Sequence, residues 1–228
     1  MSIKHSTYRP DIDGLRALAV SAVVAFHAFP LLVPGGYVGV DVFFVISGYL
    51  ITSIIGRSIK DHTFTFRDFY SRRIRRIFPA LSLVLICCLA YGWLDLLTTE
   101  LVHLGRHVAG GAAFISNWIL HKESAAHGGY FDKAAELKPL LHLWSLGIEE
   151  QFYLLWPPIA IFAVHQKWRV GRVAVILGSA SFLLNLALLH AFKEATFYLP
   201  LTRLWELLAG CALASTTLPN FRQSTKDQ

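Results

Sequence analysis

The feature that most constrains this chain is a series of seven long apolar runs separated by short polar segments. A helix that crosses a bilayer needs about 20 mostly apolar residues. Runs of nearly that length lie at residues 15–32, 38–55, 79–97, 101–120, 142–164, 170–191 and 199–215. Charged residues make up only 16% of the 228 residues, against about 25% in a typical soluble domain. We therefore predict an all-α fold, a polytopic transmembrane helical bundle with about seven spans.

The basic residues set the expected orientation of the bundle. The net charge of +6 would suggest nucleic-acid binding in a soluble protein, but here the basic residues flank apolar runs, so we expect no nucleic-acid partner. With the N-terminus in the cytoplasm, 14 Lys and Arg fall in inner segments and 5 in outer ones. This asymmetry is typical of membrane proteins, although the basic segment 167–172 disagrees with it. The fourth run is the least apolar, since it contains His103, Arg106 and His107.

Ionisable residues inside apolar runs are costly, so they mark candidate functional sites. Arg16 and His27 lie about 16 Å apart along the first helix, which puts His27 near mid-membrane if Arg16 lies at the surface. A histidine there can accept a proton, or it can be structural and hydrogen-bonded to a neighbouring helix. In the second run, Asp41 needs a partner, whereas close helix packing explains Ser47 and Gly48.

A basic and aromatic loop, residues 64–79, follows the second run. Arg72 and Arg75, or Arg73 and Arg76, are three residues apart and would share one face of a helix. One interpretation is an anchor that lies in the lipid headgroups. The other is a clamp for a phosphorylated ligand at the cytoplasmic surface, because a planar guanidinium can bind two phosphate oxygens at once.

The fifth run begins with an unusual density of polar side chains. The spacing of His142, Ser145, Glu149 and Tyr153 by three or four residues places all four on one face of a helix. Glu149 and Glu150 cannot both face lipid, so at least one must point into a polar cavity or pair with an arginine. The candidate partners are Arg106 and Arg203.

Three further features have simple interpretations. Arg203 and Glu206 lie three residues apart and can pair with each other. The three cysteines, Cys87, Cys88 and Cys211, lie in apolar runs and give no disulfide framework, so we expect buried free thiols. The polar segment 216–228 has no hydrophobic periodicity and is expected to be a disordered tail.

Taken together, the chain resembles the membrane acyltransferase-3 family, the bacterial O-acetyltransferases of lipopolysaccharide O-antigen and peptidoglycan. The matching segments keep their order and spacing over about residues 8–213. Each is weak alone, but the set is specific. The segments are 8–20, His27, 39–51, 69–80, 116–118, 130–132, 142–146, 149–153 and 203–207.

The resemblance implies a multi-pass enzyme of the bacterial inner membrane. It would move an acetyl or similar acyl group from cytoplasmic acyl-CoA, with acetyl-CoA as donor and no metal, to a hydroxyl of a saccharide or lipid-linked glycan such as O-antigen. His27 and Glu149 match the family's proposed catalytic residues, and Arg16 matches the arginine paired with the histidine. From these matches and the patterns above, we predict substrate-binding roles for Arg16, Asp41, Ser47, Arg72, Arg73, Arg75, Arg76, Ser145 and Tyr153.

The chain departs from the family in its length. Family members have further helices, so residues 1–215 would be the N-terminal, incomplete part of the membrane domain. An inactive truncated member is therefore one alternative. A transporter or channel is another, because intramembrane Arg, His and Glu also serve proton relays and substrate paths. That alternative predicts internal repeats, and the sequence shows none.

Overall fold

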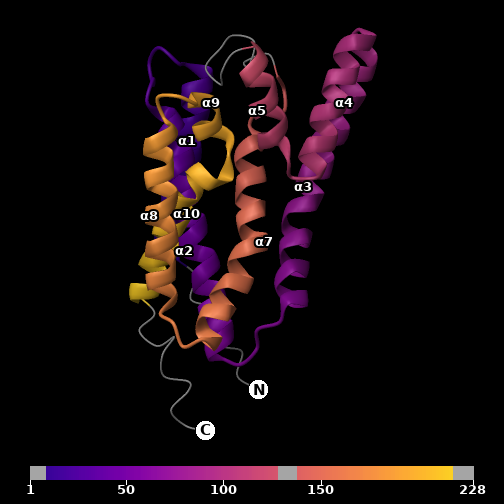
Figure 1. Ribbon diagram of the computed structural model, residues 1–228. Helices are drawn as coiled ribbons and strands as arrows, with labels where there is room; N and C mark the ends of the chain where they lie inside the picture. The colour runs from indigo at the N-terminus through magenta and orange to yellow at the C-terminus, as the bar shows by residue number, and fades with distance from the viewer. Residues whose placement is uncertain (1–8, 128–137, 218–228) are drawn as a thin grey trace.

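The computed structural model describes residues 9–127 and 138–217, and their fold is all-α, as predicted (Figure 1). The matched segment 130–132 and residues 218–228 of the expected tail lie outside the described residues. The helices are α1 Pro10–Ala28, the 3₁₀ helix η1 Gly36–Val38, α2 Gly39–Lys60, α3 Phe66–Asp95, α4 Thr98–Ala112, α5 Ser116–His127, α7 Leu143–His165, α8 Val170–Leu188, α9 Lys193–Tyr198 and α10 Pro200–Thr217. Helix α10 thus includes the first two residues of the expected tail.

The long helices run up and down beside one another (Figure 1). Helix α10 packs between α2 and α8, and α7 completes this group. The α2–α10 contact depends on glycine. A methyl group added to Gly48 would collide with the main-chain oxygen of Leu207, and one added to Gly210 would collide with that of Val45. Small residues of this kind let helix backbones approach closely in membranes.

Aromatic and aliphatic side chains fill the space between α2, α7, α8 and α10. Phe44 and Ile51 on α2, Trp144 and Trp156 on α7, and Leu207 on α10 are all at most 2% exposed. Trp156 also donates a hydrogen bond from Nε1 to Thr52 Oγ1 at 2.8 Å. This core fixes the faces of α2 and α7 that carry the candidate site residues.

The basic segment 64–79 is not the loop that the sequence suggested. It forms the start of α3, one continuous helix of 30 residues with Pro79 inside it. Thr65 caps this helix by accepting a hydrogen bond from the main-chain N–H of Asp68 at 3.2 Å, and arginine is a good helix former. Proline is tolerated inside a membrane helix, where neighbouring groups satisfy the freed carbonyl. The arginines therefore lie on the first turns of a helix.

The predicted fourth span, residues 101–120, is wrong as a single helix. The structure divides it into α4 and α5, with a turn at residues 113–115. Phe114 adopts a φ of 55°, a left-handed conformation that commonly ends a helix. The N–H of Ile115 then bonds back to the carbonyl of Gly110 at 2.8 Å. This turn after the Gly110–Gly111 pair ends α4, although the apolar run in the sequence continues through it.

Seven spans are not confirmed by the structure. Among the described residues, three helices are long and apolar enough to cross a membrane: Gly36–Lys60, Phe66–Asp95 and Val170–Leu188. Helices α4 and α5 are shorter, and α1 has three charged residues near its start. Helices α7 and α10 are interrupted by polar side chains at Glu149–Gln151 and at Arg203 and Glu206. Those interruptions are the candidate site.

Candidate active site

The centre of the candidate site is the carboxylate of Glu149, two turns into α7. Its Oε1 accepts hydrogen bonds from the hydroxyls of Ser47 on α2 and of Tyr153 on α7. All three side chains are buried. The predicted common face of Glu149 and Tyr153 is therefore confirmed. A buried carboxylate is tolerated when donors surround it, and the bond from Ser47 ties α2 to α7.

Ser145, also predicted on that face, does not join this cluster. Its hydroxyl donates to the carbonyl oxygen of His142 at 3.1 Å, at the start of α7. A serine hydroxyl on a helix can donate to the carbonyl three residues earlier on the same chain, and Ser145 uses this local partner instead of Glu149. Ser145 thus lies one turn nearer the end of the bundle.

Arg73 connects the arginines of α3 to the Glu149 cluster. Its guanidinium carbon lies 4.0 Å from the centre of the Tyr153 ring, a distance that gives a favourable cation–π interaction. Arg73 is half-buried, whereas Arg72, Arg75 and Arg76 are exposed. The basic motif therefore has two faces, one turned into the bundle and one open to the surroundings.

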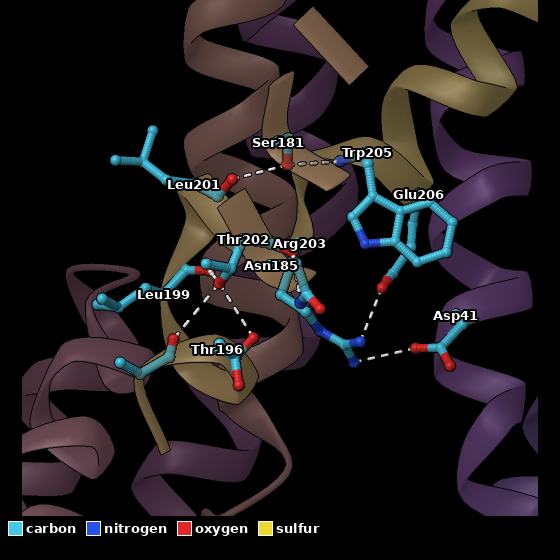
Figure 2. A network of polar contacts seen from close by, with 11 residues as sticks. Asp41, Ser181, Asn185, Thr196, Leu199, Leu201, Thr202, Arg203, Trp205 and Glu206 are labelled. Atoms are coloured by element: carbon cyan, nitrogen blue, oxygen red, sulfur yellow. Dashed lines mark hydrogen bonds and ion pairs between the residues drawn. The ribbon is translucent and has the colours of Figure 1, made fainter. Parts of the chain in front are cut away.

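A second polar cluster lies near the starts of α2 and α10, and Figure 2 shows it. Arg203 donates from one nitrogen to Asp41 Oδ1 at 2.9 Å and from another to Glu206 Oε1 at 2.7 Å. Its guanidinium also lies 5.6 Å from the ring centre of Trp144. Asp41 thus has the partner that the sequence required, and the predicted pair of Arg203 with Glu206 is confirmed. The suggested pairing of Arg203 with Glu149 does not form.

Hydrogen bonds at the start of α10 hold Arg203 in place (Figure 2). Thr202 donates to the carbonyl oxygens of Thr196 and Leu199 at 3.0 and 2.9 Å. Ser181 on α8 accepts from the main-chain N–H of Trp205 at 3.1 Å. These bonds fix α10 against α8 and α9 on both sides of the arginine.

His27 and Arg16 lie away from Glu149. His27 is exposed on the last turn of α1, with its Nδ1 2.8 Å from the carbonyl oxygen of Val23. Because a carbonyl only accepts, this contact makes Nδ1 the donor and Nε2 the basic nitrogen. Arg16 lies with its guanidinium carbon 5.2 Å from the ring centre of Phe43. The structure does not bring His27 and Glu149 together, and the catalytic role of His27 stays a prediction.

Two residues for which the sequence predicted no role, Gln151 and Asn117, connect the helices around Glu149. Gln151 donates from Nε2 to the carbonyl oxygen of Phe114 at 2.7 Å and to Asn117 Oδ1 at 2.9 Å. Asn117 is fully buried and donates to the carbonyl oxygen of Tyr198 at 3.1 Å. In the sequence, the sign of this role was a polar amide side chain within each of two apolar runs. Together they clamp α5, α7 and α9.

The described residues contain no group of three His, Cys, Asp or Glu placed to hold a metal ion. The groups that can bind an anion are the arginines of α3. Four of them, Arg67, Arg72, Arg75 and Arg76, are exposed, and the fifth, Arg73, reaches Tyr153. The exposed arginines can therefore bind phosphate oxygens at the surface. Inside the bundle, the Glu149 carboxylate is held by the hydroxyls of Ser47 and Tyr153.

Residues 9–220 match the family model described as "Acyltransferase domain". The chain belongs to this acyltransferase family. Its sequence is 40% identical over 221 residues to the "Putative peptidoglycan O-acetyltransferase YrhL" of Bacillus subtilis, covering 92% of this chain and 34% of that protein. It is 39% identical over 221 residues to the "Peptidoglycan O-acetyltransferase OatA" of Listeria monocytogenes, covering 91% of this chain and 34% of that protein.

A third relative is the "O-acetyltransferase OatA" of Staphylococcus aureus, which is 36% identical over 214 residues, again with 91% of this chain and 34% of the relative covered. The chain therefore spans about a third of the length of these relatives. No solved structure matches it. The family membership agrees with the resemblance found in the motifs.

Proposed function

We propose that this chain is the membrane part of a saccharide O-acyltransferase of the bacterial inner membrane, with its N-terminus in the cytoplasm. It would transfer an acetyl group from acetyl-CoA to a sugar hydroxyl. The observation that carries the proposal is the buried Ser47–Glu149–Tyr153 cluster with Arg73 against it. The names of the relatives favour a peptidoglycan saccharide over O-antigen as the acceptor.

The donor would bind at the arginines of α3. Coenzyme A carries several phosphate groups, and exposed guanidiniums bind phosphate by paired, charge-assisted hydrogen bonds. Arg72, Arg75 and Arg76 are exposed on the first turns of α3, while Arg73 points to Tyr153. Phosphates held by the first three would leave the thioester arm free to extend toward the Glu149 cluster.

The transfer would proceed by attack of the acceptor hydroxyl on the thioester carbonyl. The new C–O bond forms, the C–S bond breaks, and coenzyme A leaves as its thiolate. The hydroxyl proton passes to a general base, a contribution of about 10²–10⁴-fold. His27 is our candidate for that base, and because it lies away from Glu149, this role requires that substrate binding bring the reacting hydroxyl to α1. Glu149 has its hydrogen bonds to Ser47 and Tyr153 instead of His27. It would therefore position those hydroxyls around the acyl group, not the imidazole.

The test is donor binding and acetyl transfer by the purified chain in lipid nanodiscs. Changing Arg72 and Arg75 to alanine should weaken acetyl-CoA binding by about 10-fold or more per lost phosphate contact. Lysine at both positions should restore binding only in part, because it lacks the planar fork. Arg106→Ala, an exposed arginine on α4, is the matched control. Equal donor binding in all these variants would leave the arginines as a headgroup anchor.

A further inference from the structure

Helix α7 contains two adjacent prolines, Pro157 and Pro158, and continues through both of them. In an α-helix each N–H donates to the carbonyl four residues earlier, but proline has no N–H and its ring pushes that carbonyl aside. The carbonyl oxygens of Tyr153 and Leu154 therefore lose their usual donors within α7. Because the Tyr153 hydroxyl donates to Glu149, this gap in the helix bonding begins at the candidate site.

One of these two carbonyls receives a donor from α3. The Tyr70 hydroxyl donates to the carbonyl oxygen of Leu154 at 3.0 Å and so takes the place of the N–H that Pro158 lacks. Neighbouring side chains commonly satisfy such a carbonyl in membrane helices. The Tyr70 ring is half-buried, with its centre 5.2 Å from that of Phe69 and 6.3 Å from that of Phe66. These rings hold the hydroxyl at the Leu154 carbonyl.

Tyr70 and Arg73 act on consecutive residues of α7. They are three residues apart on α3, so they share one face of that helix. The Arg73 guanidinium carbon lies 4.0 Å from the ring centre of Tyr153, while Tyr70 bonds to the main chain of the next residue, Leu154. Helix α3 therefore holds both the side chain of Tyr153 and the backbone beside it.

We propose that Tyr70 is a positioning residue for acyl transfer: by replacing the missing N–H of Pro158, its hydroxyl fixes α7 at the prolines and keeps the Tyr153 hydroxyl on Glu149. The inference rests on the proposed function, in which the Glu149 cluster surrounds the acyl group. Tyr70 contacts neither substrate in that proposal. Its hydroxyl should therefore affect the transfer step and leave donor binding unchanged.

The first experiment removes only this hydroxyl, with Tyr70→Phe in nanodiscs. For acetyl transfer, kcat should fall by about 2- to 10-fold, as for one neutral hydrogen bond, with KM for acetyl-CoA unchanged. Amide hydrogen exchange of residues 149–158, followed by mass spectrometry, should become faster. The matched control is Tyr91→Phe, because Tyr91 lies on the same helix and also donates at 3.0 Å, but to Asp95 of that helix. It should change neither measurement.

The two prolines supply a rescue that a general loss of packing would not give. Pro158→Ala returns an N–H that can donate to the Leu154 carbonyl, so Tyr70→Phe should have no further effect on kcat or on exchange in that background. Pro157→Ala returns an N–H to the Tyr153 carbonyl instead, so Tyr70→Phe should keep its full effect there. If Tyr70→Phe does not fold, recovery of folded protein by Pro158→Ala alone supports the inference, and recovery by both alanines or by neither overturns it.

The exchange measurement needs no turnover, so two failures can be told apart. Absence of acetyl transfer by the unaltered chain would refute the proposed function itself. Equal exchange in Tyr70→Phe and the unaltered chain would refute the inference about Tyr70 alone. The inference would also be overturned by a raised KM with unchanged kcat, by faster exchange with unchanged kcat, or by equal effects of Tyr70→Phe in the two proline backgrounds.

Discussion

Helices α2 and α3 are both apolar enough to cross a membrane, yet they are used in opposite ways. In the most apolar 18-residue stretch of each, 44% of the residues of Gly36–Lys60 are buried but only 17% of those of Phe66–Asp95. Helix α2 packs against α1, α7 and α10. Helix α3 leaves Leu83, Ile86, Trp93 and Leu94 between 63% and 85% exposed.

The regions around α2 and α3 also differ in how they accommodate a buried polar group. On α2, Ser47 and Asp41 have partners on α7 and α10, so their positions are fixed by other helices. Next to α3, Glu123 lines a cavity, and its Oε1 has no hydrogen-bond partner among the residues that the structure describes. The α2–α7–α10 group is thus preorganised, whereas α3 leaves much of its apolar surface uncovered by the described residues.

The largest expected effect on the preorganised group comes from removing Arg203. Arg203→Ala would leave Asp41 and the fully buried Glu206 without their shared cation. An uncompensated buried charge costs about 3–5 kcal/mol, so the melting temperature in nanodiscs should fall sharply. Arg106→Ala, on the exposed side of α4, should change it little. Equal melting of the two variants would show that the cluster contributes nothing to assembly.

A somewhat smaller loss is expected at the close contact of α2 with α10. Gly48→Ala places a methyl group against the main-chain oxygen of Leu207, and overpacking of this kind costs about 1–3 kcal/mol. At Gly105 on α4, nothing lies within 4 Å of an added methyl. Gly105→Ala should therefore stabilise slightly, by up to about 1 kcal/mol of helix propensity. If Gly48→Ala and Gly105→Ala shift the melting temperature in the same direction, the predicted difference between the crowded and the open glycine is contradicted.

The smallest effect is expected on the exposed face of α3. Leu94 is 85% exposed, so Leu94→Ala should change stability by less than about 0.5 kcal/mol. The matched variant is Leu207→Ala, at a fully buried position of α10, where the loss should be about 2–5 kcal/mol. Thermal unfolding of both in the same nanodiscs measures the contrast. A large loss at Leu94 would mean that a protein surface covers α3.

The sequence predicted most of the preorganised region. The helices α2, α7, α8 and α10 lie where the apolar runs are, with ends shifted by a few residues. The spacing of Glu149 and Tyr153 on α7 and the need of Asp41 for a partner followed from helix geometry and the cost of burying charge. Which arginine would meet Asp41 depends on how α10 packs against α2, and no local pattern contains that information.

The α3–α4–α5 region was harder to predict for local reasons. The third apolar run was expected to begin at residue 79, but the Thr65 cap starts the helix 13 residues earlier and Pro79 lies inside it. The break at Phe114 needs a positive φ at a non-glycine residue, which hydropathy does not signal. Gln151 and Asn117 show their role only once α5 and α7 are side by side.

A comparison of two adjacent glutamates on α7 tests whether the Ser47–Glu149–Tyr153 cluster is the acyl-transfer site. In nanodiscs, transfer of labelled acetyl from acetyl-CoA to a saccharide acceptor is measured for Glu149→Gln and for Glu150→Gln. Glu149 accepts from Ser47 and Tyr153, and losing a charged acceptor of this kind should lower transfer by about 10-fold or more. Glu150→Gln should retain most of the activity. Equal transfer by the two variants would contradict the assignment of the Ser47–Glu149–Tyr153 cluster as the acyl-transfer site.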